Sequence, residues 1–232
     1  MDWKEKQVLL RVYFPVNVHA SNATYEIQCG NMERPTHTNT EWDFAKFEVC
    51  AHRWADLSEG NYGVSLLNDC KYGHDIHENV IGLSLIKSSV RPDETADRGK
   101  HEFTYMLYPH TGDVRHCKVQ QRATELNMPL FYVNGNGQNE TKHSEEGLFT
   151  TDCDHIYVDT VKKAEEEDAY IVRLYEFKNM TEKEAVLHCA FPIKRVVETN
   201  LVERELQEIP ADKQSFAFSV TGFEIKTFKL YL

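Results

Sequence analysis

Apolar and polar side chains alternate along most of this 232-residue chain. A period of two is typical of β-strands with one buried face, because successive side chains of a strand point to opposite sides of its sheet. The breaks between these runs are rich in Pro, Gly, Asn and Asp, which favour turns and loops. We therefore expect an all-β chain. The alternating apolar positions are Val12/Phe14/Val16/Val18, Tyr25/Ile27/Cys29, Phe47/Val49/Ala51, Ile81/Leu83/Leu85, Phe103/Tyr105/Leu107, Ile156/Val158, Tyr170/Val172/Leu174, Ala185/Leu187/Cys189, Phe216/Phe218/Val220 and Phe223/Ile225.

One segment departs from this pattern and predicts a helix. Between His116 and Asn127, an α-helical period would place Val119, Ala123 and Leu126 on one face. The Met-Pro pair that follows would end the helix after two or three turns, because proline cannot continue it.

The clearest change in composition lies at residues 134–147, which contain no apolar residue and are rich in Asn and Gly. This stretch predicts three parts: a larger β portion at 1–135, a linker or long surface loop at 136–150, and a small β-sandwich at 151–232. The charged run Lys162–Asp168 lies between two strand-like runs, so we expect a solvated hairpin loop there rather than a helix.

The formal net charge of −11 limits the partners of the chain. Nucleic acids and anionic membrane surfaces would repel a protein of this sign at physiological salt. No apolar run approaches the roughly 18 to 20 residues that are needed to cross a bilayer. We therefore expect neither nucleic acid nor membrane as a partner, whereas neutral ligands such as sugars are compatible with the charge.

The six cysteines are widely spaced and form no Cys-x-x-Cys pair, which favours a reduced compartment over a disulfide framework. The first residues lead directly into a strand-like run without a basic and then apolar leader, so we expect a cytoplasmic protein. Glycosylation sequons begin at Asn22, Asn139 and Asn179. Without export they carry no expectation of modification.

Carboxylates are the first candidates for chemistry, because a pair of them can act as general acid and as base or nucleophile, for example in the cleavage of a glycosidic bond. Asp56, Glu59, Asp69 and Asp75 lie in or beside one polar segment. The chain has 37 acidic residues, so solvated loop carboxylates are the simpler interpretation, and the sequence alone cannot pair any two of them.

Two short motifs carry metal-binding residue types. His74-Asp-Ile-His77 holds a pair of histidines, and Asp152-Cys-Asp-His155 combines acidic, His and Cys side chains. A catalytic zinc site needs a third protein ligand, and no spacing nominates one, so we predict no metal site in this chain. Phosphate-binding loops and dinucleotide fingerprints are absent from the sequence, and we expect no cofactor in it.

Residues that recognise sugars gather in two nearby segments, His52–Asp56 and Asn68–Tyr72. Aromatic rings pack against the apolar face of a pyranose ring, while Asn, Asp, Arg and Lys bond its hydroxyl groups. In the alternative, the aromatic rings pack the sheet and Arg53 pairs with Asp56 or Asp69. Both interpretations stay open. The same holds for Glu33–Thr40, which could be a binding loop or a well-bonded turn, with the turn slightly favoured.

Several longer stretches carry a resemblance to a known family. They are Ala23–Ile27, Glu33–His37, His52–Glu59, Tyr62–Asp75, Asp97–Tyr105 and Thr221–Phe228. On these stretches, which follow one another over nearly the whole chain, the sequence resembles the C-terminal β region of glycoside hydrolase family 38 α-mannosidases, specifically the cytosolic-type branch.

The resemblance implies a fold and says which part of the enzyme carries the catalytic groups. It implies an antiparallel supersandwich of the galactose-mutarotase type, followed by a small β-sandwich. It also implies a retaining mechanism whose Asp nucleophile, acid catalyst and divalent metal, usually zinc, belong to a catalytic barrel upstream of this region. No catalytic or metal-binding position is therefore carried over to this sequence. The chain is expected to be one part of a longer enzyme.

The same resemblance nominates substrate-binding residues. Arg53 is most similar to the basic group of the family that reaches the cleft, and Asn68 and Asp69 come next; alternatively, these residues only brace the interface between domains. The implied partners are the upstream barrel and a mannose-containing oligosaccharide. A segment without its barrel should expose a large apolar patch, through which a homo-oligomer could form.

Two functions follow as hypotheses. In the first, the chain completes the cleft of an α-mannosidase that hydrolyses α-linked mannose, and the chain alone is inactive because it lacks the groups that stabilise an oxocarbenium-like transition state. In the alternative, it is a stand-alone β-sandwich that binds carbohydrate or another protein.

Overall fold

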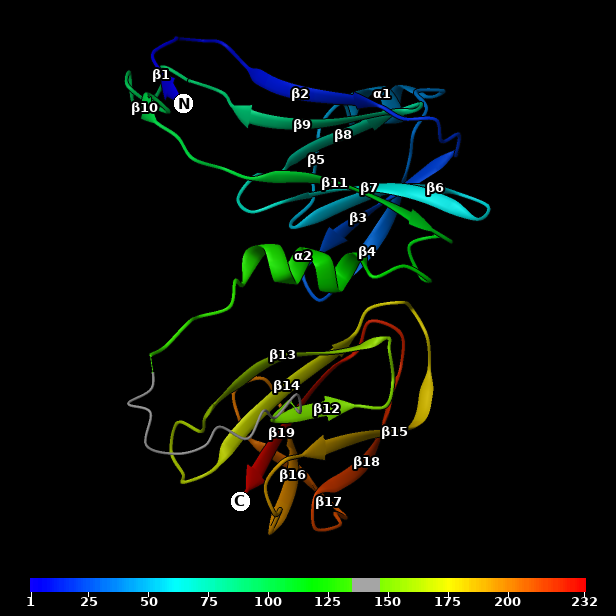
Figure 1. Ribbon diagram of the computed structural model, residues 1–232, viewed down its shortest axis with the longest axis vertical. Helices are drawn as coiled ribbons and strands as arrows, with labels where there is room; N and C mark the ends of the chain where they lie inside the picture. Colours follow the sequence, from blue (N-terminus) through cyan, green and yellow to red (C-terminus); the bar gives the residue numbers. More distant parts are fainter. Residues whose placement is uncertain (135–146) are drawn as a thin grey trace. The chain divides into compact units, whose positions relative to one another are not determined.

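The computed structural model describes residues 1–134 and 147–232. The chain forms two compact units, Met1–Val133 and Asn134–Leu232 (Figure 1). Within the described residues each unit is built mainly of antiparallel strands, so the predicted all-β class is confirmed. Most of the linker or loop predicted at 136–150 falls outside the described residues.

The first unit is built around a five-stranded antiparallel sheet with the order β11-β7-β6-β3-β4. Consecutive segments of the chain form hairpins in this sheet, as between β3 and β4 and between β6 and β7. The five strands are β3 (Asn22–Ile27), β4 (Gly30–Pro35), β6 (Trp54–Glu59), β7 (Tyr62–Asn68) and β11 (Tyr105–Thr111).

A four-stranded sheet with the order β2-β9-β8-β5 packs against one face of the five-stranded sheet, and both contribute to one apolar core. Tyr25 and Leu57 enter this core from the five-stranded sheet, whereas Ile81 and Leu83 enter it from the four-stranded one. The remaining strands of this unit are β1 (Asp2–Trp3), β2 (Leu10–Pro15), β5 (Val49–Cys50), β8 (Gly73–His77), β9 (Val80–Ile86) and β10 (Gly99–Lys100).

The other face of the five-stranded sheet is covered by helix α2 (Val119–Asn127). Val119 and Ala123 are buried against Trp54 and Leu67 of the sheet, and Leu126 packs against the same cluster. The predicted helix is therefore confirmed, with the predicted face turned toward the sheet. None of the helices within the described residues is long and apolar enough to cross a membrane.

The second unit is a sandwich of a five-stranded sheet, with the order β13-β14-β19-β16-β17, and a three-stranded sheet, with the order β12-β15-β18. Inward-facing side chains of both sheets form one core, in which the rings of Phe216, Phe218 and Phe228 contact one another. The strands are β12 (Phe149–Thr151), β13 (Ile156–Lys163), β14 (Tyr170–Glu176), β15 (Glu182–Cys189), β16 (Arg195–Thr199), β17 (Glu205–Ile209), β18 (Ser215–Val220) and β19 (Ile225–Tyr231).

Several local expectations are wrong. Cys29 lies in the turn after β3 with a positive φ of 53°, and Phe47 lies before β5 and is 75% exposed. In the run Phe223/Ile225, Ile225 begins β19 but Phe223 lies outside any strand. Phe223 is in a turn with a positive φ of 59°, where its N–H donates to the buried carboxylate of Glu176 at 2.9 Å.

The structure also contains a second helix, α1 (Glu41–Ala45), which the alternation pattern does not predict. The hairpin loop expected at Lys162–Asp168 is present between β13 and β14, but it begins after Lys163, because Lys162 and Lys163 end β13.

The aromatic cluster in the second unit gives a stability prediction. Phe228 is fully buried, with its ring centroid 4.9 Å from Phe216 and 5.1 Å from Phe218. We expect Phe228→Ala to lower the free energy of unfolding of this unit by about 3 to 5 kcal/mol, because it leaves a cavity. The half-exposed Phe191 is the control, and Phe191→Ala should change stability by less than about 0.5 kcal/mol. Urea unfolding followed by circular dichroism measures both, and equal effects would contradict the packing described.

Candidate functional site

The predicted residues Arg53, Asn68 and Asp69 lie together at one end of the β6–β7 hairpin. Arg53 precedes β6, Asn68 ends β7, and Asp69 follows it. The backbone N–H of Asn68 donates to the carbonyl of Arg53 at 2.9 Å, which continues the ladder that pairs Trp54 with Leu67. The antiparallel pairing of these two strands therefore brings together residues that the sequence separates.

Arg53 forms an ion pair with Glu26 of β3. Its Nε donates to Glu26 Oε1 at 2.9 Å, and its backbone N–H donates to Oε2 of the same carboxylate at 2.7 Å. The Glu26 side chain is only 3% exposed, whereas the Arg53 side chain keeps 25% of its surface exposed. An N–H of the guanidinium also donates to Thr124 Oγ1 of α2 at 3.3 Å. In the described residues its ion-pair partner is thus Glu26, and the alternative pairing with Asp56 or Asp69 is wrong.

Asn68 is buried, and protein groups engage both ends of its amide. Its Nδ2 donates to the carbonyl of His52 at 2.9 Å, and its Oδ1 accepts from the backbone N–H groups of Cys70 and Lys71. This arrangement holds the turn after β7 and ties it to the segment before β6. Contact of Asn68 with a sugar stays a prediction, and the bonds present give it a positioning role.

Asp69 connects the same turn to the segment before β11. Its Oδ2 accepts from the N–H of Thr104 at 2.9 Å, and its own N–H donates to the carbonyl of Thr104 at 3.1 Å. Burial acts to raise the pKa of Asp69, but the hydrogen bonds from Cys70 and Thr104 outweigh it and lower the pKa below its ordinary value. Asp69 is therefore held as a carboxylate at the half-buried edge of the loop.

The aromatic residues of these segments divide into two roles. Trp54 is buried in the cluster beneath α2, where its Nε1 donates to Gln120 Oε1 at 2.9 Å. Tyr72 is exposed, and its ring meets the edge of His52 with 5.7 Å between the ring centroids. The packing interpretation therefore holds for Trp54, and Tyr72 remains the ring that can meet a ligand.

A cavity of about 240 Å³ lies between the loop after β4 and strand β8. It is lined by Arg34 and His37 from the segment Glu33–Thr40, and by Asp75 and His77 from β8. The segment is also a well-bonded turn, since Thr36 bonds Ser21 and Ala20, and Thr40 caps α1. The turn interpretation of the segment is confirmed, whereas a binding role for it stays a prediction.

Each of the four candidate carboxylates has a protein partner. Asp56 bonds Ser58, Ser65 and His110; Glu59 accepts from the backbone N–H of His19; Asp75 pairs with Arg11; and Asp69 bonds Thr104. These contacts are within the protein and orient loops or strands. The expectation of solvated loop carboxylates is wrong for Asp56, which is 1% exposed on β6, and Glu59 and Asp75 also lie on strands. All four carboxylates are engaged by groups of the protein.

The histidines of the first metal motif do not form a pair. His74 is fully buried and His77 is exposed, because residues three apart on strand β8 point to opposite faces of the sheet. Burial lowers the pKa of His74 to about 4, although the carbonyl of Tyr72 opposes this shift. Among the described residues, the one group of three potential metal ligands within reach of each other is in the second unit: Cys153, His155 and Glu182.

A buried charge pair on the α2 face of the five-stranded sheet was not expected. His110 Nε2 donates to Asp56 Oδ2 at 2.7 Å, and its Nδ1 faces the carbonyl of Gly112 at 3.1 Å, so both ring nitrogens have acceptors. Burial acts to lower the pKa of His110, but the interactions with Asp56 and, next, with Cys117 outweigh it and raise the pKa to about 10. Ser65 Oγ donates to the same Asp56 oxygen at 2.6 Å.

Comparison with known families identifies the chain. The family model for the glycosyl hydrolases family 38 C-terminal domain matches residues 1–95, and that for the family 38 C-terminal beta sandwich domain matches residues 155–228. The chain belongs to glycoside hydrolase family 38. It contributes C-terminal domains of that family, as the resemblance predicted, and its relatives include members of the cytosolic-type branch.

Two curated relatives from the family 38 α-mannosidases show how much of such a protein the chain represents. Alpha-mannosidase G from Dictyostelium discoideum is 43% identical over 99% of this chain and 21% of its own length. Alpha-mannosidase 2C1 from Homo sapiens is 42% identical over 87% of the chain and 19% of its own length. The chain therefore spans about a fifth of the length of the relatives that it matches.

A solved α-mannosidase structure has the same fold. The crystal structure of an alpha-mannosidase from Enterococcus faecalis V583 aligns with 96% of this chain and 26% of its own, with a TM-score of 0.78 at 20% sequence identity. The arrangement of strands is thus shared where most side chains differ. The predicted fold, a supersandwich region followed by a β-sandwich, is confirmed.

The His110–Asp56 pair predicts a pH dependence of stability. Since folding raises the pKa of His110 from about 6.5 to about 10, the pair contributes fully below pH 6.5, and this contribution is lost as the pH rises through 10. We expect the melting temperature of the wild type to fall more steeply between pH 7 and 10 than that of His110→Gln. His116→Gln, which changes an exposed histidine, should keep the wild-type slope. Equal slopes in all three proteins would contradict the buried imidazolium.

Proposed function

We propose that this chain is the C-terminal part of an α-mannosidase that hydrolyses α-linked mannose from oligosaccharides. The observation that carries the proposal is the match over nearly the whole chain to two α-mannosidases of which it represents about a fifth. In this proposal the chain completes one wall of a cleft, and an upstream catalytic barrel supplies the other. The cytosolic-type relative supports a cytoplasmic location.

Arg53 is the proposed contact with substrate from this chain. The ion pair with Glu26 and the bond to Thr124 hold its guanidinium in one orientation, while a quarter of the side chain remains exposed. An oriented guanidinium can donate to the hydroxyl oxygens of a sugar without losing much further entropy on binding. Such a donor helps to fix the position of a mannose ring relative to groups on the barrel.

Asn68 and Asp69 belong to the same proposed substrate-binding edge. Asn68 holds the turn that leads to Tyr72, and Asp69 anchors this turn to the segment before β11. The exposed ring of Tyr72 can pack on the apolar face of a sugar. We propose that the turn presents ring, guanidinium and carboxylate together toward the oligosaccharide.

The nucleophile, the acid catalyst and the metal that family resemblance implies are assigned to the upstream barrel. Near Arg53 the described residues offer no group of His and carboxylate ligands that could hold a metal. The ion pairs and hydrogen bonds of Asp56, Asp69 and Asp75 also engage these carboxylates within the chain. What this chain contributes is therefore orientation of the substrate and the shape of the cleft.

Exposed aromatic side chains support a docking partner for the first unit. Trp42, Phe44 and Phe47 lie within or just after α1, and each is at least 71% exposed. Large apolar groups gathered in one short segment favour contact with another protein surface. We propose that they pack against the upstream catalytic barrel, and that in the separated chain a second copy can occupy the same surface.

Because the proposal assigns the catalytic groups to the upstream barrel, it predicts that the chain alone is inactive. We expect no turnover of a nitrophenyl α-mannoside by the isolated chain, with or without added Zn²⁺, because it lacks a preorganised nucleophile and acid. The whole protein, purified in parallel, should hydrolyse the same substrate. Metal-dependent turnover by the isolated chain would contradict the proposal, and so would a whole protein that fails to cleave any α-mannoside.

The role of Arg53 gives a second prediction, to be tested in the whole protein. A hydrogen bond from a charged group to the transition state contributes about 1.5 to 3 kcal/mol, which corresponds to roughly 10- to 150-fold in kcat/KM. We therefore expect Arg53→Ala to lower kcat/KM by a factor in this range. Arg53→Lys should recover only part of the activity, because lysine cannot keep the same paired bonds to Glu26.

Arg122→Ala is the matched control, since Arg122 is an exposed arginine of α2 that pairs with Glu125. It should leave kcat/KM unchanged. Circular dichroism and unfolding curves of each variant separate a lost contact from a lost fold. Wild-type kcat/KM in a folded Arg53→Ala enzyme would contradict the substrate contact.

A further inference from the structure

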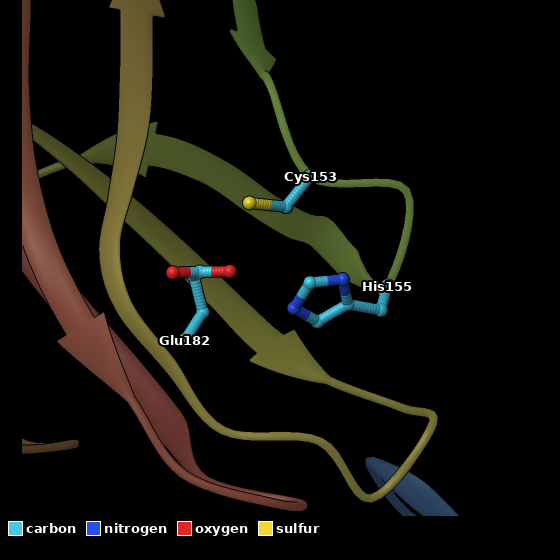
Figure 2. Close-up of side chains that lie close together, drawn as sticks. All are labelled: Cys153, His155 and Glu182. Carbon is cyan, nitrogen blue, oxygen red and sulfur yellow. The ribbon is translucent and has the colours of Figure 1, made fainter.

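Three potential metal ligands converge in the second unit. The Sγ of Cys153, a ring nitrogen of His155 and a carboxylate oxygen of Glu182 lie within 4.8 Å of one another. Figure 2 shows the three side chains pointing toward a common point, with Cys153 and His155 coming from the loop between β12 and β13, and Glu182 from the start of β15. None of the functions derived above uses them.

The local backbone holds the loop in place. The N–H of Cys153 donates to Thr151 Oγ1 at 3.2 Å, and the carbonyl of His155 accepts from the N–H of Phe177 at 3.0 Å. A register shift between Glu182 and Ala185 interrupts the pairing of β15 with β18. Such bulges redirect side chains, and here Glu182 is turned toward the loop.

His155 supplies an independent sign of a missing ligand. Its side chain is only 8% exposed, and its buried Nε2 has no hydrogen-bond partner among the described protein atoms. Buried polar atoms are nearly always partnered, so an exception of this kind calls for an explanation. The other nitrogen, Nδ1, faces Asp154 Oδ1 at 3.6 Å. A carboxylate beside one ring nitrogen commonly orients a histidine that binds a metal through the other.

We propose that Cys153, His155 and Glu182 bind one divalent cation of the zinc class. Sulfur, nitrogen and oxygen donors together suit a borderline-soft ion such as Zn²⁺ rather than Mg²⁺ or Ca²⁺, which prefer oxygen alone. Tetrahedral zinc with bonds of about 2.0 to 2.3 Å needs ligand atoms about 3.4 to 3.7 Å apart. Side-chain rotations that bring the atoms about an ångström closer therefore complete the site. Because Cys153 and Glu182 are half-buried, solvent can reach the fourth position.

The surrounding charges favour a cation. Asp152 accepts a hydrogen bond from the Cys153 thiol at 3.3 Å, and Asp154 pairs with Lys178 at 2.8 Å. Burial, together with Asp152 and Glu182, raises the pKa of Cys153 to about 11, so the thiol is protonated in the absence of metal. Binding then displaces this proton to solvent, and the cation neutralises the thiolate and Glu182.

The bound ion would join the two layers of the sandwich. His155 immediately precedes β13 of the five-stranded sheet, whereas Glu182 lies on β15 of the three-stranded sheet. A ligand that binds only the folded state stabilises it. The proposed site thus links the two sheets and is separate in function from the catalytic metal expected in the upstream barrel. Sequence spacing missed it because the third ligand comes from a different strand.

The test uses the complete chain after removal of metal with a chelator. Titration with Co²⁺ should give one equivalent of binding, with a thiolate-to-metal charge-transfer band in the near ultraviolet and visible bands typical of tetrahedral geometry. Competition with a coloured chelator then gives the Zn²⁺ affinity. Cys153→Ser should remove the charge-transfer band and weaken Zn²⁺ binding by about 100-fold or more. Glu182→Gln should keep the band and weaken binding.

Cys50→Ser is the matched control, because Cys50 is an exposed cysteine of the first unit and lies outside the cluster. It should retain wild-type affinity and the band. Zn²⁺ should also raise the unfolding midpoint of the wild type and of Cys50→Ser, but not that of Cys153→Ser. A wild type that shows no band, or a band and affinity that persist in folded Cys153→Ser, would overturn the site.

Discussion

The first unit depends on neutralising one buried carboxylate. Glu26 lies on a strand inside the sheet with almost no exposed surface, and an unpaired charge there would cost several kcal/mol. Arg53 meets this requirement through its guanidinium and its backbone N–H. The fold therefore fixes the orientation of the one cation that we propose to contact substrate. Arg53 lies at the end of the β6–β7 hairpin because of the pairing of these two strands.

The two faces of the five-stranded sheet carry different kinds of contact. One face packs apolar side chains against the four-stranded sheet. The other combines the Trp54 cluster beneath α2 with the polar group of Asp56, Ser65 and His110. Successive side chains of β6 and β7, such as those of Trp54 and Ala55, point to opposite faces of the sheet. The same two strands therefore supply residues to both kinds of contact. A single hairpin thus supports the core and the charged cluster.

Much of the fold could be predicted from sequence, because alternation and helical periodicity are local properties. The helical spacing of Val119 and Ala123 correctly predicts the face of α2 that packs against the sheet. Phe223 followed the alternation rule and failed, because a long-range bond to Glu176 determines the turn in which it lies. The proposed sugar-binding edge could be predicted only in part. Its segments stand out in the sequence by their residue types, but Glu26, which orients Arg53, has the pattern of an ordinary polar position of a strand.

The bond between Arg53 and Thr124 connects the proposed sugar-binding edge with the last helix of the first unit. That helix ends at Asn127, shortly before the chain passes into the second unit. The same helix also reaches the other side of this edge, because Asn127 Nδ2 donates to the carbonyl of Asn68 at 3.0 Å. A substitution that displaces α2 would therefore move the guanidinium of Arg53 and the turn after β7 together, although the helix itself has no side chain in the proposed sugar-binding edge.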